Sequence, residues 1–186
     1  LTGLILALAL VYLGSHAVQS NWSYFTMYRF KWTPRTIGIS LAVVGALVAL
    51  VQGVLIRWIT PKIGNEKSIF IGLLLYAAGM FLFAFSNQSW MMFVFLIPYC
   101  LGGIAGPALQ AIMSGNVPRN AQGELQGALT SVMSLTAIIG PLLMTNLFAY
   151  FTSVQAPVLF PGAPFLLGGL LMLASAIVAY KSLKQN

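Results

Sequence analysis

The chain has 186 residues, of which 59% are hydrophobic and only 6% are charged, and its mean hydropathy is +0.91. An ordinary soluble domain carries roughly 25% charged residues, so a soluble protein of this composition would have almost no polar surface. The net charge of +7 does not indicate nucleic-acid binding, because the basic residues lie singly or in small clusters between apolar stretches. The composition indicates a membrane protein, which we expect to be embedded in the lipid bilayer.

Four stretches carry no Asp, Glu, Lys or Arg: residues 1–28, 36–56, 68–118 and 125–180. A bilayer core about 30 Å thick is crossed by a helix of about 20 apolar residues. The first two stretches are long enough for one such helix each, and the last two for two each. We therefore expect an all-α membrane protein, with residues 1–186 forming one six-helix bundle. The predicted spans are at about 2–24, 38–58, 68–85, 90–113, 125–148 and 164–180.

The chain begins with Leu1 rather than Met, and no basic segment precedes its first apolar stretch. A cleaved signal peptide has a basic segment and a shorter apolar run. We therefore expect a processed product or a piece of a longer protein, and no signal peptide.

Six spans place both chain ends on the same side of the membrane. Basic residues gather on the cytoplasmic side of membrane proteins, and more of them fall on the side of the chain ends, which we therefore expect to be cytoplasmic. Four tryptophans near the predicted span ends fit an aromatic belt at the membrane surface: Trp22, Trp32, Trp58 and Trp90. The side with the ends carries Arg57, Lys62, Lys67, Arg119, Lys181 and Lys184, and the other side carries Arg29, Lys31 and Arg35.

His16 is the one ionisable side chain expected near the middle of the membrane, and Tyr12, Gln19 and Ser23 share its helix face. Ionisable residues at this depth face a bundle interior or a water-filled cavity. Two interpretations stay open: a functional His16, and a neutral His16 satisfied by a neighbouring helix. A proton relay would need a carboxylate at the same depth, and the chain has none there.

The second predicted span combines small residues with one amide. An amide in hydrocarbon needs partners, so Gln52 is expected either to bond a neighbouring helix or to line a cavity. The small residues share a face and predict close helix packing: Gly38, Ala42, Gly45, Ala49 and Gly53.

Prolines stand inside the predicted spans over 90–113 and 125–148. Pro107 cannot donate a hydrogen bond to the carbonyl of Gly103, so the helix should kink there, and Pro141 should act in the same way. Bent helices are tolerated where they line a cavity or are buried in protein. We expect gating helices, with static kinks as the alternative, and assign Gly106, Pro107, Gly140 and Pro141 to this role.

Enzyme signatures are absent from the sequence. It contains no HExxH, Walker A or GxSxG motif, and only one His and one Cys. An intramembrane serine protease would have to pair Ser114 with His16, and nothing in the sequence pairs them. We expect no enzyme, no metal and no cofactor.

Several segments together resemble the tetracycline-efflux branch of the major facilitator superfamily. They are RFKW at residues 29–32, GISLA at 38–42 leading to Gln52, KIG at 62–64, GIAGPALQ at 103–110, QGELQG at 122–127 and IGPLL at 139–143. The resemblance covers about residues 14–148. It implies the C-terminal six-helix half of a transporter of about 12 helices, with two inverted three-helix repeats in each half.

The resemblance also implies a mechanism. Substrate binds between the two halves, and the protein rocks between inward-open and outward-open states while it exchanges drug for protons. The spans over 2–24, 38–58, 90–113 and 125–148 then line the cavity and approach the missing N-terminal half. Arg57, Lys62, Gly64 and Lys67 would match the family's cytoplasmic loop motif, although a simple positive-inside anchor explains them equally well.

Two positions depart from the family pattern. Well-known tetracycline antiporters carry a carboxylate where this chain has Tyr76, and they can carry a histidine where it has Val48. Proton coupling would then use carboxylates of the missing half, with His16 as a further candidate. The departures also weaken the case for tetracycline itself as the substrate.

We therefore expect half of a proton-coupled, tetracycline-like drug efflux transporter in a bacterial inner membrane, with drug and protons as cargo. The alternatives are uptake of a sugar or small metabolite and a non-transporting membrane scaffold; polar residues on several cavity-facing helices count against the scaffold. The predicted substrate-binding residues are His16, Gln19, Gln52, Gln110 and Tyr76.

Overall fold

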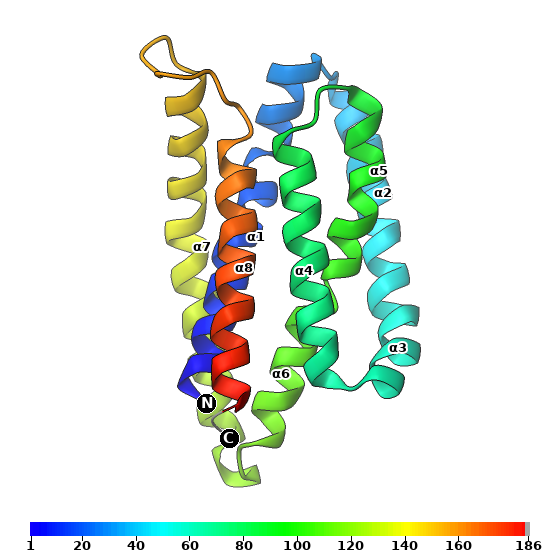
Figure 1. Cartoon of the computed structure of the whole chain (residues 1–186), viewed down its shortest axis with the longest axis vertical. Coiled ribbons are helices and arrows are strands. Elements are labelled where there is room, and N and C mark those ends of the chain that lie inside the picture. Colours follow the sequence, from blue (N-terminus) through cyan, green and yellow to red (C-terminus); the bar gives the residue numbers. More distant parts are fainter. Residues whose placement is uncertain (185–186) are drawn as a thin grey trace.

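The structure is a computed structural model that describes residues 1–184, and these residues form helices joined by short connections. Six helical spans are long and apolar enough to cross a membrane, which confirms the predicted all-α, six-helix membrane fold. The spans run alternately up and down, so the two ends of the described chain lie at the same end of the bundle (Figure 1).

The spans contain eight α-helices and two short helical segments of other types. Each span is longer than hydropathy predicted, because hydropathy marks the part inside lipid while the helix continues until a turn residue ends it. The elements are α1 (Thr2–Phe30), α2 (Pro34–Leu50), the π-helix η1 (Val51–Leu55), α3 (Ile56–Ile63), α4 (Asn65–Ala84), α5 (Ser89–Gly102), α6 (Ala105–Gly115), the 3-10 helix η2 (Arg119–Ala121), α7 (Gln122–Thr152) and α8 (Ala163–Lys184).

Local turn chemistry ends and starts these helices. Lys31 takes a left-handed φ of 55° and ends α1. Thr33 accepts a hydrogen bond from the backbone N–H of Thr36, and Pro34 occupies the first position of α2. Gly64 alone joins α3 to α4 with a φ of 83°, a conformation that glycine adopts without strain.

The helices α1 and α4 form the centre of the bundle. α1 packs against α7 and α8, while α4 packs against α5, α6 and α8. Glycines allow the backbones of α4 and α5 to approach closely. A Cβ atom on Gly79 would lie 2.8 Å from the backbone of Tyr99, and one on Gly102 would lie 2.7 Å from the backbone of Tyr76.

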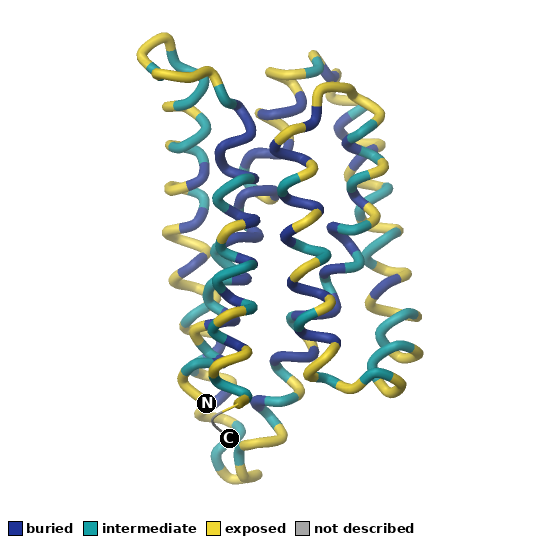
Figure 2. Tube along the Cα trace, viewed as in Figure 1, coloured by how far each residue is buried: buried dark blue, intermediate teal, exposed yellow. Residues whose placement is uncertain are grey.

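Two spans are much less covered than the other four. In the apolar windows of Pro34–Ile63 and Arg119–Thr152 only 11% and 17% of residues are buried, against 44–50% elsewhere. Figure 2 shows the exposed residues along both spans. Large apolar side chains are exposed on them, including Ile39, Leu41 and Leu142. Within the described residues, these two spans have faces that no other helix covers.

The small-residue face of α2 belongs to this uncovered surface. Space is open within 4 Å of where a Cβ atom would stand on Gly38, Gly45 and Gly53. The predicted close packing of this face is therefore wrong among the helices of the described chain. α2 instead turns Ile37 and Ser40 inward.

The tryptophans divide into two pairs. Trp58 and Trp90 are exposed, whereas Trp22 and Trp32 are buried, with 3% and 6% of their surface accessible. The membrane-surface prediction is wrong for Trp22, because α1 continues well beyond it and places its ring inside the bundle. There its Nε1 donates a hydrogen bond to Oγ of Ser40 at 2.9 Å, which links α1 to α2.

Candidate functional site

The fourth span is interrupted at Gly103 and Ile104, between α5 and α6. This is the position that the sequence predicted, because Pro107 has no N–H to bond the carbonyl of Gly103. The chain turns more tightly here: the N–H of Gly103 bonds the carbonyl of Cys100 at 3.0 Å. Beyond the interruption, Gly106 has open space where a Cβ would stand.

Pro141 does not interrupt its helix, since α7 is continuous through it. Pro141 differs from Pro107 in this respect, and the predicted kink at Pro141 stays a prediction, because a proline can bend a helix without interrupting it. The local sequences explain the difference. Four residues before Pro141 stands Ala137, a strong helix former, whereas the equivalent position before Pro107 is Gly103.

Gln110 of α6 contacts α1. Its Nε2 donates a hydrogen bond to the hydroxyl of Tyr12 at 3.1 Å, and both side chains are half-buried. Polar side chains of facing membrane helices commonly pair in this way, since hydrocarbon offers no partner. Tyr12 was placed on the polar face of the first span but was not among the predicted site residues.

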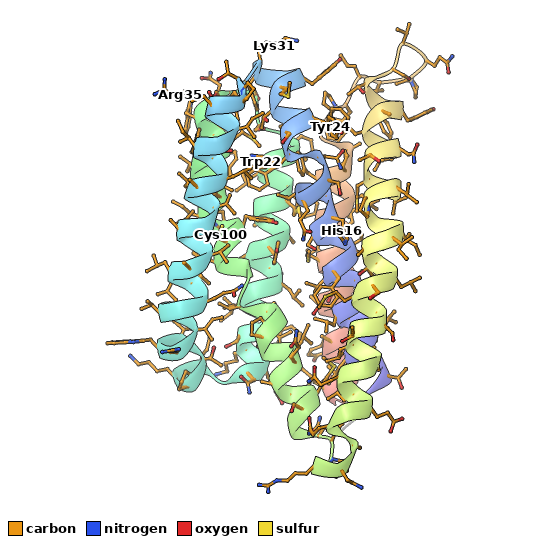
Figure 3. The ribbon with its side chains drawn as sticks, turned by 180° about the vertical axis from the view of Figure 1, so that it is seen from behind. His16, Trp22, Tyr24, Lys31, Arg35 and Cys100 are labelled. Carbon is orange, nitrogen blue, oxygen red and sulfur yellow. The ribbon has the colours of Figure 1, made fainter. Side chains whose placement is uncertain are left out.

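His16 lies one helical turn beyond Tyr12, on the side of α1 that faces α7 (Figure 3). A Cβ atom on Gly140 would lie 2.6 Å from Cγ and 2.9 Å from Cβ of His16. The imidazole therefore occupies space that a side chain at position 140 would need. This contact is steric, so both interpretations of His16 stay open.

Gln19 and Gln52 are exposed. Nε2 of Gln19 donates to Oγ of Ser15 at 3.1 Å, within the same helix. Gln52 lies in the π-helical segment η1, a type of segment that is frequent at functional sites. Tyr12 lies about 15 Å along its helix from Thr2, and Gln52 lies about 16 Å along its span from Ile63. Thr2 and Ile63 are the helix ends on the side of the chain termini, so the two side chains lie at similar depths.

Tyr76 takes part in a contact between two helices. It lies on α4, and its ring packs edge-on against Tyr99 of α5 with the ring centroids 4.8 Å apart. The same segment of α4 carries the close backbone contact with Gly102. Tyr76 therefore lies in the α4–α5 packing contact.

The predicted basic loop is a single-residue turn. Pro61 lies inside α3, which continues to Ile63, so Gly64 alone separates α3 from α4. Oγ of Ser68 donates to the carbonyl of Gly64 at 2.8 Å. The basic side chains around the turn are exposed, and Nζ of Lys62 lies 5.9 Å from the ring centroid of Trp58.

Gln122 is a functional candidate that the sequence did not single out. Its Nε2 donates to the backbone carbonyls of Ser114 and Val117, both at 2.8 Å, and its Oε1 accepts from Oγ of Ser114 at 2.9 Å. These bonds tie the end of α6 to the start of α7. Ser114 is therefore paired with Gln122, and the protease pairing with His16 has no support in the structure.

Acidic side chains stand at helix starts. Glu66 lies in the first turn of α4 and Glu124 in the first turn of α7. Over residues 1–184, no three His, Cys, Asp or Glu side chains gather closely enough to hold a metal ion. The candidate residues can form hydrogen bonds through the amides of Gln19, Gln52 and Gln110 and through the phenol of Tyr12. Neither Glu66 nor Glu124 lies in the middle of a span.

Comparisons with known proteins match nearly the whole chain. A family model described as the Major Facilitator Superfamily matches residues 4–185. The chain is 41% identical over 149 residues to the tetracycline resistance protein, class E, of Escherichia coli, covering 80% of this chain and 37% of that protein. It is 36% identical over 159 residues to the class H protein of Pasteurella multocida, covering 86% of this chain and 38% of that protein.

A solved structure has the same fold. The human organic anion transporter MFSD10 (TETRAN) superposes with a TM-score of 0.78 at 22% identity, covering 95% of this chain and 39% of that chain. The chain therefore spans 37–39% of the length of these three proteins.

Proposed function

Because the chain belongs to the Major Facilitator Superfamily, we propose that it is the C-terminal half of a proton-coupled drug efflux transporter that works by alternating access. The family match makes it part of a membrane transporter and not an enzyme, as the sequence predicted. The similarity to tetracycline resistance proteins supports drug efflux. Because the chain spans about two fifths of their length, we propose that a second six-helix half completes it.

The uncovered faces of the second and fifth spans are the main support for a missing half. Only 11% and 17% of their apolar windows are buried, and an open small-residue face on α2 leaves room for another helix to approach. In Figure 3, α1, α6 and α7 lie in front of α8, and His16 of α1 lies beside α7 on this side. We propose that the missing N-terminal half covers this side and that drug binds between the halves.

Three amides are the proposed drug-binding groups: Gln19, Gln52 and Gln110. A small number of polar groups in a largely apolar cavity orients a ligand, and the amides would donate and accept hydrogen bonds with a polar, ring-containing drug. Rings at the two other predicted positions lie against neighbouring helices, so we propose that His16 and Tyr76 shape the walls. Gly106, Pro107, Gly140 and Pro141 are the proposed positions at which α6 and α7 bend.

The coupling proton needs a carboxylate to carry it, and this chain has none in the middle of its spans. Its two carboxylates, Glu66 and Glu124, stand at the starts of α4 and α7. We therefore propose that the carboxylates that accept and release protons belong to the missing half.

We further propose a bacterial inner membrane with both termini in the cytoplasm. Arg57, Lys62 and Lys67 lie around the α3–α4 turn, at the same end of the bundle as the termini (Figure 1). Lys31 and Arg35 lie at the opposite end (Figure 3). The larger number of basic residues at the termini end supports this orientation, with Gly64 completing the proposed cytoplasmic loop.

The decisive experiment removes single amides from the full-length protein expressed in bacteria. We expect Gln110→Leu and Gln52→Leu each to lower drug resistance about tenfold or more, the effect of losing about 1.4 kcal/mol of interaction, while membrane abundance stays normal. Gln155→Leu, in the exposed connection between α7 and α8, is the matched control. Resistance that survives both cavity substitutions would contradict the assignment.

A second measurement tests the proposal of a half. The 186-residue chain alone, reconstituted in proteoliposomes, should show no drug-dependent proton flux, because no second half encloses the cavity. Flux by the chain alone would contradict a missing half.

A further inference from the structure

Gly140 differs from the other glycines of α7 in what lies next to it. At Gly123 and Gly127 there is open space within 4 Å of where a Cβ atom would stand. At Gly140 the same position is occupied by the side chain of His16, with Cγ at 2.6 Å and Cβ at 2.9 Å. Gly140 is buried and His16 is half-buried, so the imidazole meets α7 while part of the residue stays accessible.

This contact lies at the weakest turn of α7. Pro141 has no N–H, so the carbonyl of Ala137 lacks its usual partner within the helix. Helices bend most readily at such positions. His16 is 14 residues beyond Thr2, and therefore about 21 Å from that end of α1. Because α1 has 29 residues and is about 43 Å long, His16 lies near the middle of this helix.

Building on the proposed alternating-access function, we propose that His16 is a positioning residue whose ring fits into the notch at Gly140 and sets the distance between α1 and α7 at the Pro141 turn. The contact is steric, so the shape of the ring matters and its ability to carry a proton does not. Its role is to make α1 and the bendable turn of α7 move together during the conformational step, which affects turnover more than drug affinity.

The first test is a suppressor experiment in the full-length transporter. Gly140→Ala places a methyl group where the imidazole lies and is expected to lower the melting temperature by about 3 °C or more and the turnover number by about tenfold. Gly127→Ala, on the same helix but away from His16, is the control, and His16→Ala should not reverse any effect that it has. Combining Gly140→Ala with His16→Ala should restore much of the melting temperature, because the obstructing ring is gone.

The second test separates positioning from direct chemistry. His16→Phe retains a flat ring but no nitrogen atom, so it should keep KM for drug close to the original value and retain much of the turnover, whereas His16→Ala should lower turnover without a matching change in KM. Loss of transport in His16→Phe, or a large rise in its KM, would show that His16 binds drug or carries the proton, and would overturn the proposal.

The melting temperatures keep this test independent of the proposed function. If the full-length protein transports no drug, the efflux proposal fails, but the suppressor pattern still reports on the contact. Absence of suppression of Gly140→Ala by His16→Ala, or equal suppression of Gly127→Ala, would overturn the positioning role even in an active transporter.

Discussion

The hydroxyl of Tyr12 accepts a hydrogen bond from Nε2 of Gln110 at 3.1 Å, and this bond joins α1 to α6 across 98 residues of sequence. Gln110 follows Pro107 by one helical turn, so the bond holds the segment of α6 just beyond the interruption. The same amide is a proposed drug-binding group. A drug that bonds to Gln110 therefore competes with Tyr12 or shares the amide with it, which couples binding to the attachment of α6.

A double-mutant cycle measures this attachment. We expect Tyr12→Phe and Gln110→Leu to be non-additive in the free energy of unfolding of the purified full-length protein. The expected coupling is about 0.6 kcal/mol, the average for hydrogen bonds between membrane helices. Tyr12→Phe combined with Gln126→Leu, on the exposed side of α7, should be additive. Additivity in both pairs would contradict a stabilising bond between Tyr12 and Gln110.

The contact of α4 with α5 leads to a prediction about glycine. Gly79→Ala would place a methyl group 2.8 Å from the backbone of Tyr99, and backbone atoms cannot move aside as a side chain can. We expect a loss of about 1–3 kcal/mol of stability from this overpacking, measured as a lower unfolding midpoint. Gly45→Ala on the open face of α2 is the control. In the 186-residue chain it should be neutral or slightly stabilising, because alanine favours helix. Equal effects at the two positions would contradict the close α4–α5 packing.

The fold was largely predictable because the spanning helices are marked by long stretches without charged residues. Long uncharged stretches have few alternatives to spanning helices, and all six were confirmed. Helix ends were less predictable, since the second span was expected to end at about residue 58 and its helix continues to Ile63. The π-helical segment around Gln52 left no recognisable mark, because an α-helix and a π-helix differ by one residue in hydrogen-bond spacing.

The candidate site was predictable along one helix and unpredictable between helices. Periodicity placed Tyr12, His16 and Gln19 on one face of the first span, but their partners depend on how distant segments pack. The contact of His16 with Gly140 joins residues that no local pattern relates. Trp22 shows the same limit. We expected it at the membrane surface, but its Nε1 donates a hydrogen bond to Ser40 inside the bundle.

Asn21 offers a test of the cost of burial. It is fully buried, and neither its Oδ1 nor its Nδ2 has a hydrogen-bond partner in the described part of the chain. A buried polar group without a partner costs about 1–3 kcal/mol. We therefore expect Asn21→Leu, which is similar in size, to raise the melting temperature by several degrees, about 2–4 °C per kcal/mol. Asn146→Leu is the control, because Nδ2 of Asn146 donates to the carbonyl of Leu142 at 2.7 Å on an exposed face, and it should give no gain. A lower melting temperature for Asn21→Leu would mean that the amide is bonded.

Gln122 is expected to hold the connection between α6 and α7 in one conformation. The last carbonyls of a helix have no partner within it, and here the side chain of Gln122 bonds the carbonyls of Ser114 and Val117. Gln122→Ala removes both bonds together with the one from Oγ of Ser114. We expect amide hydrogen exchange over residues 114–121 to become about tenfold faster, which corresponds to about 1.4 kcal/mol of local stability.

Gln126→Ala provides the control for this connection, because it removes an exposed glutamine one turn further along α7. Exchange over residues 114–121 should stay unchanged in that variant. If the two variants exchange equally fast, the three bonds of Gln122 do not stabilise the connection. If only Gln122→Ala speeds exchange, the ends of α6 and α7 are held together by this side chain.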